Sequence, residues 1–403
     1  MDDNSLESGY FSMGAPKETT FFRLFNRPPE VLSSAPGRIN LIGEHTDYNG
    51  GYVLPAAIHL RTYFLAAPRD DRVVRIWAEN FEEEEIFGLD SITPTKNKRW
   101  ANYVKGIFWV LQQEGHKLRG INAVIRGDVP LESGLSSSAA LEVSVIKGLS
   151  ALWADEIPPL EMAKLAQRAE NDFVGVKCGL MDQFISVFAK KDTALFLDCE
   201  TLESSYYPLN LERAGLAILV YDTRVRRKLA ASEYNRRRQE AAQALEILRT
   251  KGAQTYKEAT EAILESARSD LKPIPYKRAK HVISENDRVR KALEALGKDD
   301  FSALGDLLFL SHESLRDNYE VSCPELDLLY EVGKKFPGCL GARLVGAGFG
   351  GSGIALLEKA AGEEFRESLL FEAKIRAYPK PEFYEVSIGQ GADATKVDRP
   401  GGQ

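Results

Sequence analysis

Short runs of apolar, β-branched and aromatic residues occur along the chain between polar or glycine-containing turns, and each run predicts a β-strand. These runs are Tyr63–Ala67, Val73–Trp77, Ile121–Ile125, Thr193–Leu197, Ala217–Tyr221, Gly353–Leu357 and Phe383–Ile388. The first two flank the polar turn Pro68–Asp71, so we expect them to pair as a hairpin.

Other stretches repeat apolar residues at helical spacing. The first is Ala139–Leu152. The second is opened by Pro158-Pro159 and has apolar residues at Met162, Leu165, Ala166, Ala169 and Phe173. The later segments are Ser232–Lys251, His281–Leu296, Phe301–Leu315 and Pro324–Lys335. Gly252 follows one of these segments, and glycine is common just past the end of a helix. The pattern predicts a mixed α+β protein in two lobes and leaves the topology open.

The length of the chain supports two domains. Its 403 residues exceed the roughly 250–300 residues at which a single hydrophobic core usually stops growing. We expect a flexible arm over residues 1–17, an N-terminal domain over 18–205, a C-terminal domain over 206–390 and a frayed tail over 391–403. The polar stretch near residue 205 marks the expected boundary, and a cleft is expected between the domains.

Composition and charge restrict the function. With 44% apolar and 28% charged residues, the chain is typical of globular proteins rather than disordered or fibrous ones. Its net charge of −7 argues against general binding to nucleic acid or to an anionic membrane. The four cysteines are widely separated, the N-terminus lacks an apolar signal segment, and no stretch approaches the ~20 apolar residues of a membrane span. We expect a cytoplasmic protein that is a monomer or a weak dimer.

The segment VPLESGLSSSAA, Val129–Ala140, has the composition of an anion-binding loop at the start of a helix. The first turn of a helix has backbone N–H groups without internal partners, and small residues let an anion approach them closely. Ser136, Ser137 and Ser138 add hydroxyl groups that could bind phosphate or Mg²⁺, although serines also cap helices without binding anything. No P-loop or protein-kinase signature is present, so a nucleotide site here would be of another kind.

The segment APGRINLIGEHTDYNGG, Ala35–Gly51, contains the consecutive polar residues Glu44–Asn49. Buried polar groups without partners cost about 1–3 kcal/mol each, so this run is either a solvated loop or the lining of a polar pocket. Its donors and acceptors suit a polyhydroxylated ligand, and Arg38 supplies a permanent cation for a phosphate.

Three further features are ambiguous when taken alone. Five glycines between Gly346 and Gly353 permit close approach of a ligand to the backbone, but a glycine-rich hairpin would look the same. Asp182 lies among apolar residues and is either a paired structural acid or a base. Glu170, near the end of the helix opened by Pro159, is most simply a solvated or capping carboxylate.

Together these segments closely resemble the galactokinases of the GHMP small-molecule kinase superfamily. GRINLIGEHTDYNGG resembles the galactokinase signature, GLSSSAALEV the superfamily phosphate loop and GARLVGAGFGGS its third motif. Further blocks, including RAENDFVGVKCGLMDQFIS, extend the resemblance over roughly residues 22–388. It implies a two-lobed GHMP kinase fold, with an N-terminal lobe of mixed sheet plus helices, a C-terminal ferredoxin-like lobe and an active site in the cleft between them.

The resemblance also implies an activity: transfer of the γ-phosphoryl group of MgATP to the C1 hydroxyl of α-D-galactose. Asp182 would be the acid–base residue, and Arg38 would help to keep it ionised and stabilise charge on the transferred group. The residues implied for sugar contact are Glu44, His45, Thr46, Asp47, Gly179 and Tyr234. Those implied for the nucleotide are Glu132, Ser133, Gly134, Leu135, Ser136, Ser137 and Ser138, with Trp100 and Tyr103 near the adenine. Ser138 and Glu170 would lie near Mg²⁺.

The sequence departs from the family pattern at two positions. Glu132 stands where the family usually has glycine, and its carboxylate would repel a triphosphate unless it points away or toward the metal. Ser352 stands where cysteine is usual, and we expect little effect because the two are similar in size. Two alternative functions stay open: a C1 kinase for arabinose, galacturonate or N-acetylgalactosamine, and a non-catalytic galactose/ATP sensor. The intact serine run and Asp182 argue against the sensor.

Overall fold

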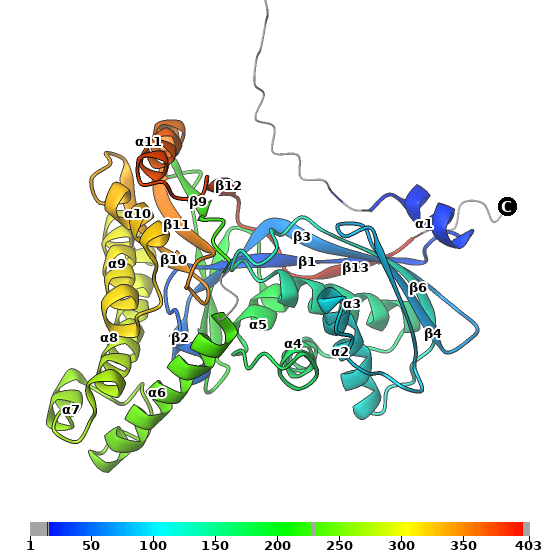
Figure 1. Cartoon of the computed structure of the whole chain (residues 1–403), viewed down its shortest axis with the longest axis horizontal. Helices are drawn as coiled ribbons and strands as arrows, with labels where there is room; N and C mark the ends of the chain where they lie inside the picture. The colour runs from blue at the N-terminus through cyan, green and yellow to red at the C-terminus, as the bar shows by residue number, and fades with distance from the viewer. Residues whose placement is uncertain (1–13, 15, 227–229, 398–403) are drawn as a thin grey trace, which may run out of the picture.

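The structure is a computed structural model that describes residues 14, 16–226 and 230–397. Its first lobe contains a six-stranded sheet with the order β13-β1-β3-β6-β4-β5. The strands are β1 (Val31–Asn40), β3 (Pro55–Pro68), β4 (Val73–Ala78), β5 (Glu83–Gly88), β6 (Ile121–Gly127) and β13 (Asp393–Lys396). Helices cover one face of this sheet (Figure 1): α2 (Arg99–Gln113), α3 (Ser137–Trp153), α4 (Pro159–Arg168) and α5 (Met181–Phe188). The opposite face packs Leu65 and Val124 against Phe21 of α1 (Glu18–Phe25).

The second lobe contains an antiparallel sheet with the order β10-β11-β9-β12. Its strands are β9 (Leu216–Asp222), β10 (Cys339–Val345), β11 (Ser352–Glu358) and β12 (Glu382–Val386). One face packs against α10 (Pro324–Gly333) and α11 (Gly362–Ile375). The other face joins α8 (Pro273–Leu296), α9 (Phe301–Ser314) and strands β1 and β3 in a core shared by both lobes. This strand order is that of a ferredoxin-like lobe, which confirms the expected fold class.

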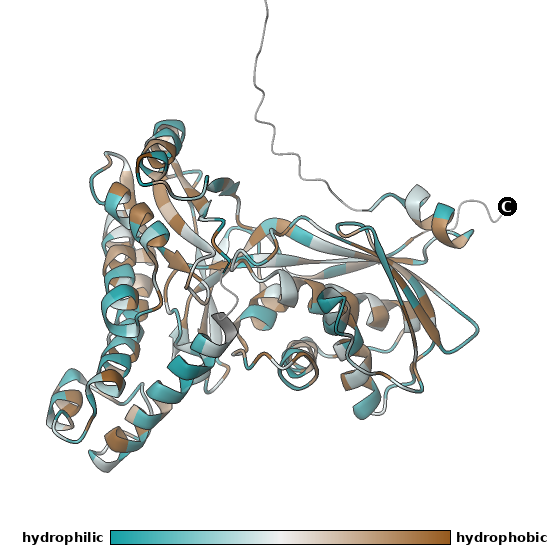
Figure 2. Ribbon diagram, in the orientation of Figure 1, coloured by the Kyte–Doolittle hydropathy of each residue, from teal (hydrophilic) through white to brown (hydrophobic). Residues whose placement is uncertain are grey.

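The remaining elements surround the junction of the lobes. Strands β2 (Tyr52–Val53), β7 (Thr193–Asp198) and β8 (Ser204–Pro208) form a three-stranded sheet in the order β2-β7-β8. Helix α6 (Ala230–Thr250) is mostly hydrophilic (Figure 2), and it packs its few apolar residues against α8 and the short α7 (Glu261–Ser266). Two π-helical turns, Ala169–Val174 and Leu315–Tyr319, follow α4 and α9 directly.

The expected hairpin between Tyr63–Ala67 and Val73–Trp77 is wrong. Strand β6 lies between β3 and β4, antiparallel to the first and parallel to the second. Strand β4 instead pairs antiparallel with β5, whose sequence EEEIFG is too acidic to have been recognised as a strand. The physical reason is burial: residues 121–125 of β6 are all buried and lie inside the sheet, whereas the acidic and partly exposed β5 suits its edge.

The prediction of a frayed tail over residues 391–403 is wrong for β13. This strand pairs antiparallel with β1, from Val31 opposite Lys396 to Ser34 opposite Asp393. Residues 398–403 of the expected tail, and residues 1–13 and 15 of the expected arm, lie outside the described residues. The boundary near residue 205, which falls within β8, stays a prediction. The other predicted strands and helices are present with small shifts at their ends, with three exceptions. Strand β3 begins at Pro55 rather than Tyr63, α8 begins at Pro273 rather than His281, and α4 passes into a π turn after Arg168. None of the helices in the described ranges is long and apolar enough to span a membrane.

Candidate active site

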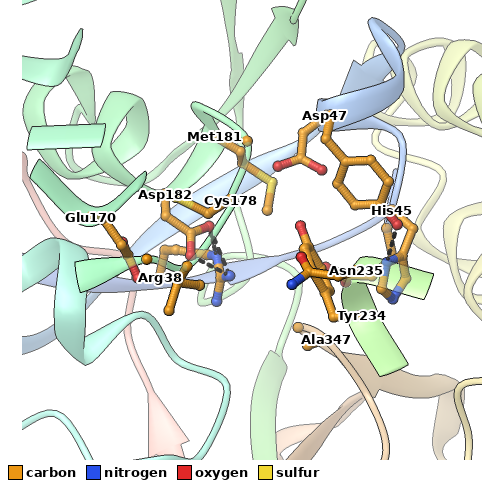
Figure 3. Close-up of a pocket in the computed structure, with 16 residues that line it drawn as sticks. Arg38, His45, Asp47, Glu170, Cys178, Met181, Asp182, Tyr234, Asn235 and Ala347 are labelled. Atoms are coloured by element: carbon orange, nitrogen blue, oxygen red, sulfur yellow. Dashed lines mark hydrogen bonds and ion pairs between the residues drawn. The ribbon is translucent and has the colours of Figure 1, made fainter. Parts of the chain in front are cut away.

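A cavity of about 220 Å³ lies where both lobes meet α6. Its walls come from the end of β1, the loop before β2, the segment between α4 and α5, the start of α6 and the turn between β10 and β11. The residues lining it are Arg38, Glu44, His45, Asp47, Tyr48, Glu170, Gly175, Val176, Cys178, Gly179, Met181, Asp182, Tyr234, Asn235, Gly346 and Ala347. Figure 3 shows Arg38 and Asp182 facing Tyr234 and Asn235 across this space.

Arg38 and Asp182 form the polar centre of the cavity. Arg38 is 5% exposed, and its Nε and Nη2 atoms donate to Asp182 Oδ1 at 2.8 Å and Oδ2 at 2.9 Å. Its Nη1 donates to the carbonyl of Gly134 at 2.6 Å, and its backbone N–H donates to Leu135 at 3.0 Å. Asp182 also accepts a 2.5 Å hydrogen bond from Ser136 Oγ. The carboxylate is therefore held in place between the cavity and the predicted phosphate loop.

Glu44 is held by an arginine from the other lobe. Arg343 on β10 pairs with the Glu44 carboxylate at 2.5 Å and donates to the carbonyls of Asn40 and Leu41, both at 2.9 Å. Arg343 is fully buried and Glu44 nearly so. Burial raises the pKa of Glu44 above its ordinary value, and the charge of Arg343 opposes that rise.

Asp47 and Gly179 meet at another wall of the cavity. A Cβ atom added at Gly179 would lie 1.9 Å from Asp47 Oδ2, so only glycine fits at this position. Burial raises the pKa of Asp47 to about 7, and the negative charge of Asp182 adds to the shift. Asp47 and Asp182 therefore line the same cavity. Among the described residues that line it, Arg38 is the one lysine or arginine, and it is bonded to Asp182.

Aromatic rings from three elements form the remaining wall. His45 lies 4.8 Å from Tyr319 and 5.7 Å from Tyr234 between ring centroids, and its Nδ1 is 2.7 Å from the hydroxyl of Tyr48. That hydroxyl in turn lies 2.9 Å from the hydroxyl of Tyr319. Burial, with a further contribution from His281, lowers the pKa of His45 well below its ordinary value, so the imidazole is neutral.

The predicted phosphate loop lies between β6 and α3. Gly134 and Ser136 adopt left-handed backbone conformations, with φ of 81° and 61°. Ser133 donates to the carbonyl of Pro130 at 2.7 Å and Ser136 to Asp182, so both hydroxyls are bonded within the protein. Ser137 and Ser138 begin α3 and are partly exposed. The backbone of the loop and the Ser137 hydroxyl are groups available to an anion, whereas the Ser138 hydroxyl is bonded to Glu170.

A second cavity, of about 500 Å³, opens on the other side of this loop. Ser137, Ser138 and Glu132 line it together with Trp100 and Tyr103 of α2. Trp100 stacks on Phe81 and donates through Nε1 to Glu83 at 2.9 Å. Glu132 itself is exposed, and Arg226 lies close enough for the two charges to attract. Its carboxylate thus has a cation nearby.

Three buried polar groups lie beneath the loop. Gln183 Nε2 donates to Glu170 at 2.8 Å and to Glu142 at 3.2 Å. Glu170 also accepts from Ser138, which lines the second cavity. Burial raises the pKa of both carboxyl groups, and their mutual repulsion raises that of Glu142 further. Glu170 is thus not the solvated carboxylate that its sequence position suggested.

The structure brings together all the residues implied for sugar contact except Thr46. The Thr46 side chain does not line the cavity, and its hydroxyl lies 2.7 Å from the carbonyl of Gly43 and 2.6 Å from that of Tyr52. Sequence reasoning gave no individual role to the cavity residues Tyr48 and Asn235 or to the buried partners Arg343, Glu142 and Gln183. Tyr48 and Arg343 lie within motifs that the sequence did reveal, but nothing in the sequence shows which partner each one contacts.

Comparisons with known proteins first define the class. Models of the GHMP kinase N-terminal and C-terminal domains match residues 102–190 and 292–374, which identifies the two-lobed protein as a GHMP kinase. A model of the galactokinase galactose-binding signature matches residues 19–68. The chain is 44% identical to a galactokinase of Thermotoga petrophila over 357 residues, covering 89% of this chain and 98% of the relative. It is 42% identical to a galactokinase of Pyrococcus furiosus over 362 residues, covering 90% and 99%. The chain therefore belongs to the galactokinase family.

Comparison with solved structures supports the same family assignment. The crystal structure of Lactococcus lactis galactokinase complexed with galactose superposes with a TM-score of 0.89 at 39% identity, covering 94% of this chain and 98% of that one. The Methanococcus jannaschii mevalonate kinase superposes with a TM-score of 0.64 at 19% identity, which supports the fold alone.

Proposed function

We propose that this protein transfers the γ-phosphoryl group of ATP to the C1 hydroxyl of α-D-galactose, giving galactose 1-phosphate and ADP. The observation that carries the proposal is the Asp182 carboxylate, which Arg38 and Ser136 hold between the 220 Å³ cavity and the phosphate loop. A base in that place can take the proton of a hydroxyl in the cavity while the oxygen of that hydroxyl attacks a phosphorus held at the loop. The family assignment supports the same reaction.

The cavity suits a hexose. Glu44 and Asp47 offer carboxylate acceptors for sugar hydroxyls, Tyr234 offers a hydroxyl, and His45 is a neutral ring at the same wall. Because Gly179 has no side chain, its backbone comes close to Asp47 and leaves room for the sugar. We assign sugar contact to these five residues.

Asp182 acts as the base in the proposed reaction. It accepts the proton of the C1 hydroxyl as the C1 oxygen bonds to the γ-phosphorus, the bond from that phosphorus to the bridging oxygen breaks, and ADP leaves. A positioned base typically contributes about 10²–10⁴-fold to the rate. Arg38 offsets charge on the transferred group and keeps Asp182 oriented. The backbone of residues 132–138 would hold the phosphates, with Trp100 and Tyr103 near the adenine.

The residues present fit a Mg²⁺ ion bound together with ATP. Within the described ranges no cluster of three or more His, Cys, Asp or Glu side chains could hold a metal by itself. Mg²⁺ in kinases is usually bound by one or two protein oxygens plus substrate phosphates and water, and Glu170 and Ser138 offer such oxygens beside the loop. When bound, the ion would neutralise negative charge on the phosphate oxygens. A cytoplasmic location and a monomeric or weakly dimeric state complete the proposal.

Initial rates with ATP and Mg²⁺ across a panel of sugars test this function. Galactose should be phosphorylated at the highest kcat/KM, with arabinose, galacturonate and N-acetylgalactosamine far behind, as measured by ADP release coupled to NADH oxidation. A different preferred sugar would replace galactose as the substrate. Galactose binding without ADP release under any condition would identify a sensor and contradict the proposal.

A further inference from the structure

Gln183 connects three elements that carry the proposed catalytic groups. It follows Asp182 in α5, and its single amide nitrogen donates both to Glu170 in the π turn after α4 and to Glu142 in α3. The side-chain amide has two hydrogens, so it can satisfy both carboxyl groups at once. Gln183 is fully buried, which makes these bonds its main interactions rather than incidental surface contacts.

Glu142 lies on the same face of α3 as Ser138, four residues earlier. It is fully buried, and in the described part of the chain no lysine or arginine forms an ion pair with it. Its partners are Gln183, at 3.2 Å, and the carboxyl group of Glu170. A buried carboxyl group without a cation is costly to keep in a core, where an apolar residue of similar size would pack at no such cost.

Glu170 is consequently fixed from both sides. Gln183 and Glu142 contact it from the protein interior, and the Ser138 hydroxyl contacts it at the start of α3. The geometry points to Glu142 and Gln183 as positioning residues that hold the Glu170 carboxylate beneath the phosphate loop for the nucleotide-bound metal ion. This inference rests on the proposed function for the identity of the ion. It explains why two polar residues with no access to the substrate occupy the core beside Asp182.

The effect on metal affinity follows from this geometry. Groups that orient a metal ligand typically change metal affinity by about 10–100-fold when they are replaced. Gln183→Met removes both hydrogen bonds at similar volume, and Glu142→Leu removes one partner of Glu170. Glu142→Gln keeps an acceptor for Gln183 and offers Glu170 a donor, so it should retain the arrangement.

The test is binding of Mn²⁺ to each full-length protein with a non-hydrolysable ATP analogue, measured from the free Mn²⁺ signal in electron paramagnetic resonance. Gln183→Met and Glu142→Leu should weaken Mn²⁺ binding at least about tenfold. Glu142→Gln should stay within about threefold of the parent protein. Galactose affinity, followed by tryptophan fluorescence, should be unchanged in all three variants. Gln112→Leu in α2, which loses a side-chain amide bond to the backbone carbonyl of Leu89 at an exposed position, is the control and should change neither affinity.

Parent-like Mn²⁺ affinity in both Gln183→Met and Glu142→Leu would overturn the inference, and so would an equal loss in Glu142→Gln and Glu142→Leu. If Glu142→Leu fails to fold, Gln183→Met and Glu142→Gln decide the question. Because Mn²⁺ binding is measured without turnover, a parent protein that binds the metal with nucleotide but leaves galactose unphosphorylated would contradict the proposed function and not this inference.

Discussion

Arg38 and Asp182 are separated by 144 positions in the chain and meet in a two-point ion pair, with N–O distances of 2.8 and 2.9 Å. Arg38 lies within β1, next to an irregularity in the pairing of that strand with β3, and Asp182 lies in the first turn of α5. The third nitrogen of the guanidinium holds the carbonyl of Gly134. One arginine therefore sets the distance between the proposed base and the phosphate loop, and both must be in place for in-line transfer.

Replacing Asp182 by asparagine should remove the base while preserving the shape of the cavity. We expect kcat to fall by about 10²–10⁴-fold, because asparagine cannot accept the C1 proton, and galactose affinity to change far less. ADP release and tryptophan fluorescence measure the two quantities. Asp172→Asn, at an exposed position in the nearby π turn, is the matched control and should behave like the parent. Turnover within about tenfold of the parent would show that Asp182 is not the base.

Replacing Gly179 by alanine should weaken the binding of galactose more than the binding of ATP. The added Cβ would lie 1.9 Å from Asp47 Oδ2, so either the loop or Asp47 must move. We expect the KM for galactose to rise about tenfold or more, with a small change in the KM for ATP, because the displaced group faces only the first cavity. Gly175→Ala, where a Cβ meets no atom but the backbone is left-handed, tests whether backbone strain alone has this effect. Equal changes in both KM values for Gly179→Ala would contradict the assignment.

Asp47 should make stability without ligands depend on pH. Its pKa is raised from 3.8 to about 7 by burial and by Asp182, so the folded state holds this proton more tightly than the unfolded chain. The carboxyl group therefore destabilises the fold progressively as pH rises from about 4 to about 7, and the full penalty remains above pH 7. Asp47→Asn should raise the melting temperature at pH 8 and lose that advantage toward pH 4. Asp70→Asn, at an exposed turn, should show no such pH-dependent gain.

Local patterns identified two segments of the site as candidate binding loops. The polar run before Gly50 and the serine run before α3 could each be read as a ligand-binding loop, because so many polar or small residues in a row do not fit a core. Ser136 of the serine run bonds to Asp182, and so does Arg38, which precedes the polar run in the segment Ala35–Gly51. The resemblance to galactokinases supplied the roles of these residues, which composition and spacing alone left open.

Contacts between distant segments could not be predicted. Arg343 lies 299 positions from Glu44, and Gln183 lies 41 from Glu142, so no local periodicity relates the partners. Buried ion pairs and amide bridges depend on how whole elements pack. The same reason explains the wrong hairpin: Tyr63–Ala67 and Val73–Trp77 are adjacent in sequence, yet β6, whose residues 121–125 are all buried, takes the position between them.

The pairing of β13 with β1, which the polar sequence of β13 did not indicate, can be tested by truncation. β13 completes the edge of the large sheet on β1, Ala394 packs against the core of the first lobe, and Asp393 accepts a 2.6 Å hydrogen bond from Ser34. Truncation after Gly391 should therefore lower the free energy of unfolding in urea by on the order of 2–4 kcal/mol, since about one kcal/mol is lost for each backbone hydrogen bond. Truncation after Val397 keeps the strand and should leave stability close to that of the parent. Because β13 lies away from both cavities, the kcat of the protein truncated after Gly391 should stay near the parent value at 25 °C. Equal stability of the two truncated proteins would show that β13 contributes nothing to the sheet.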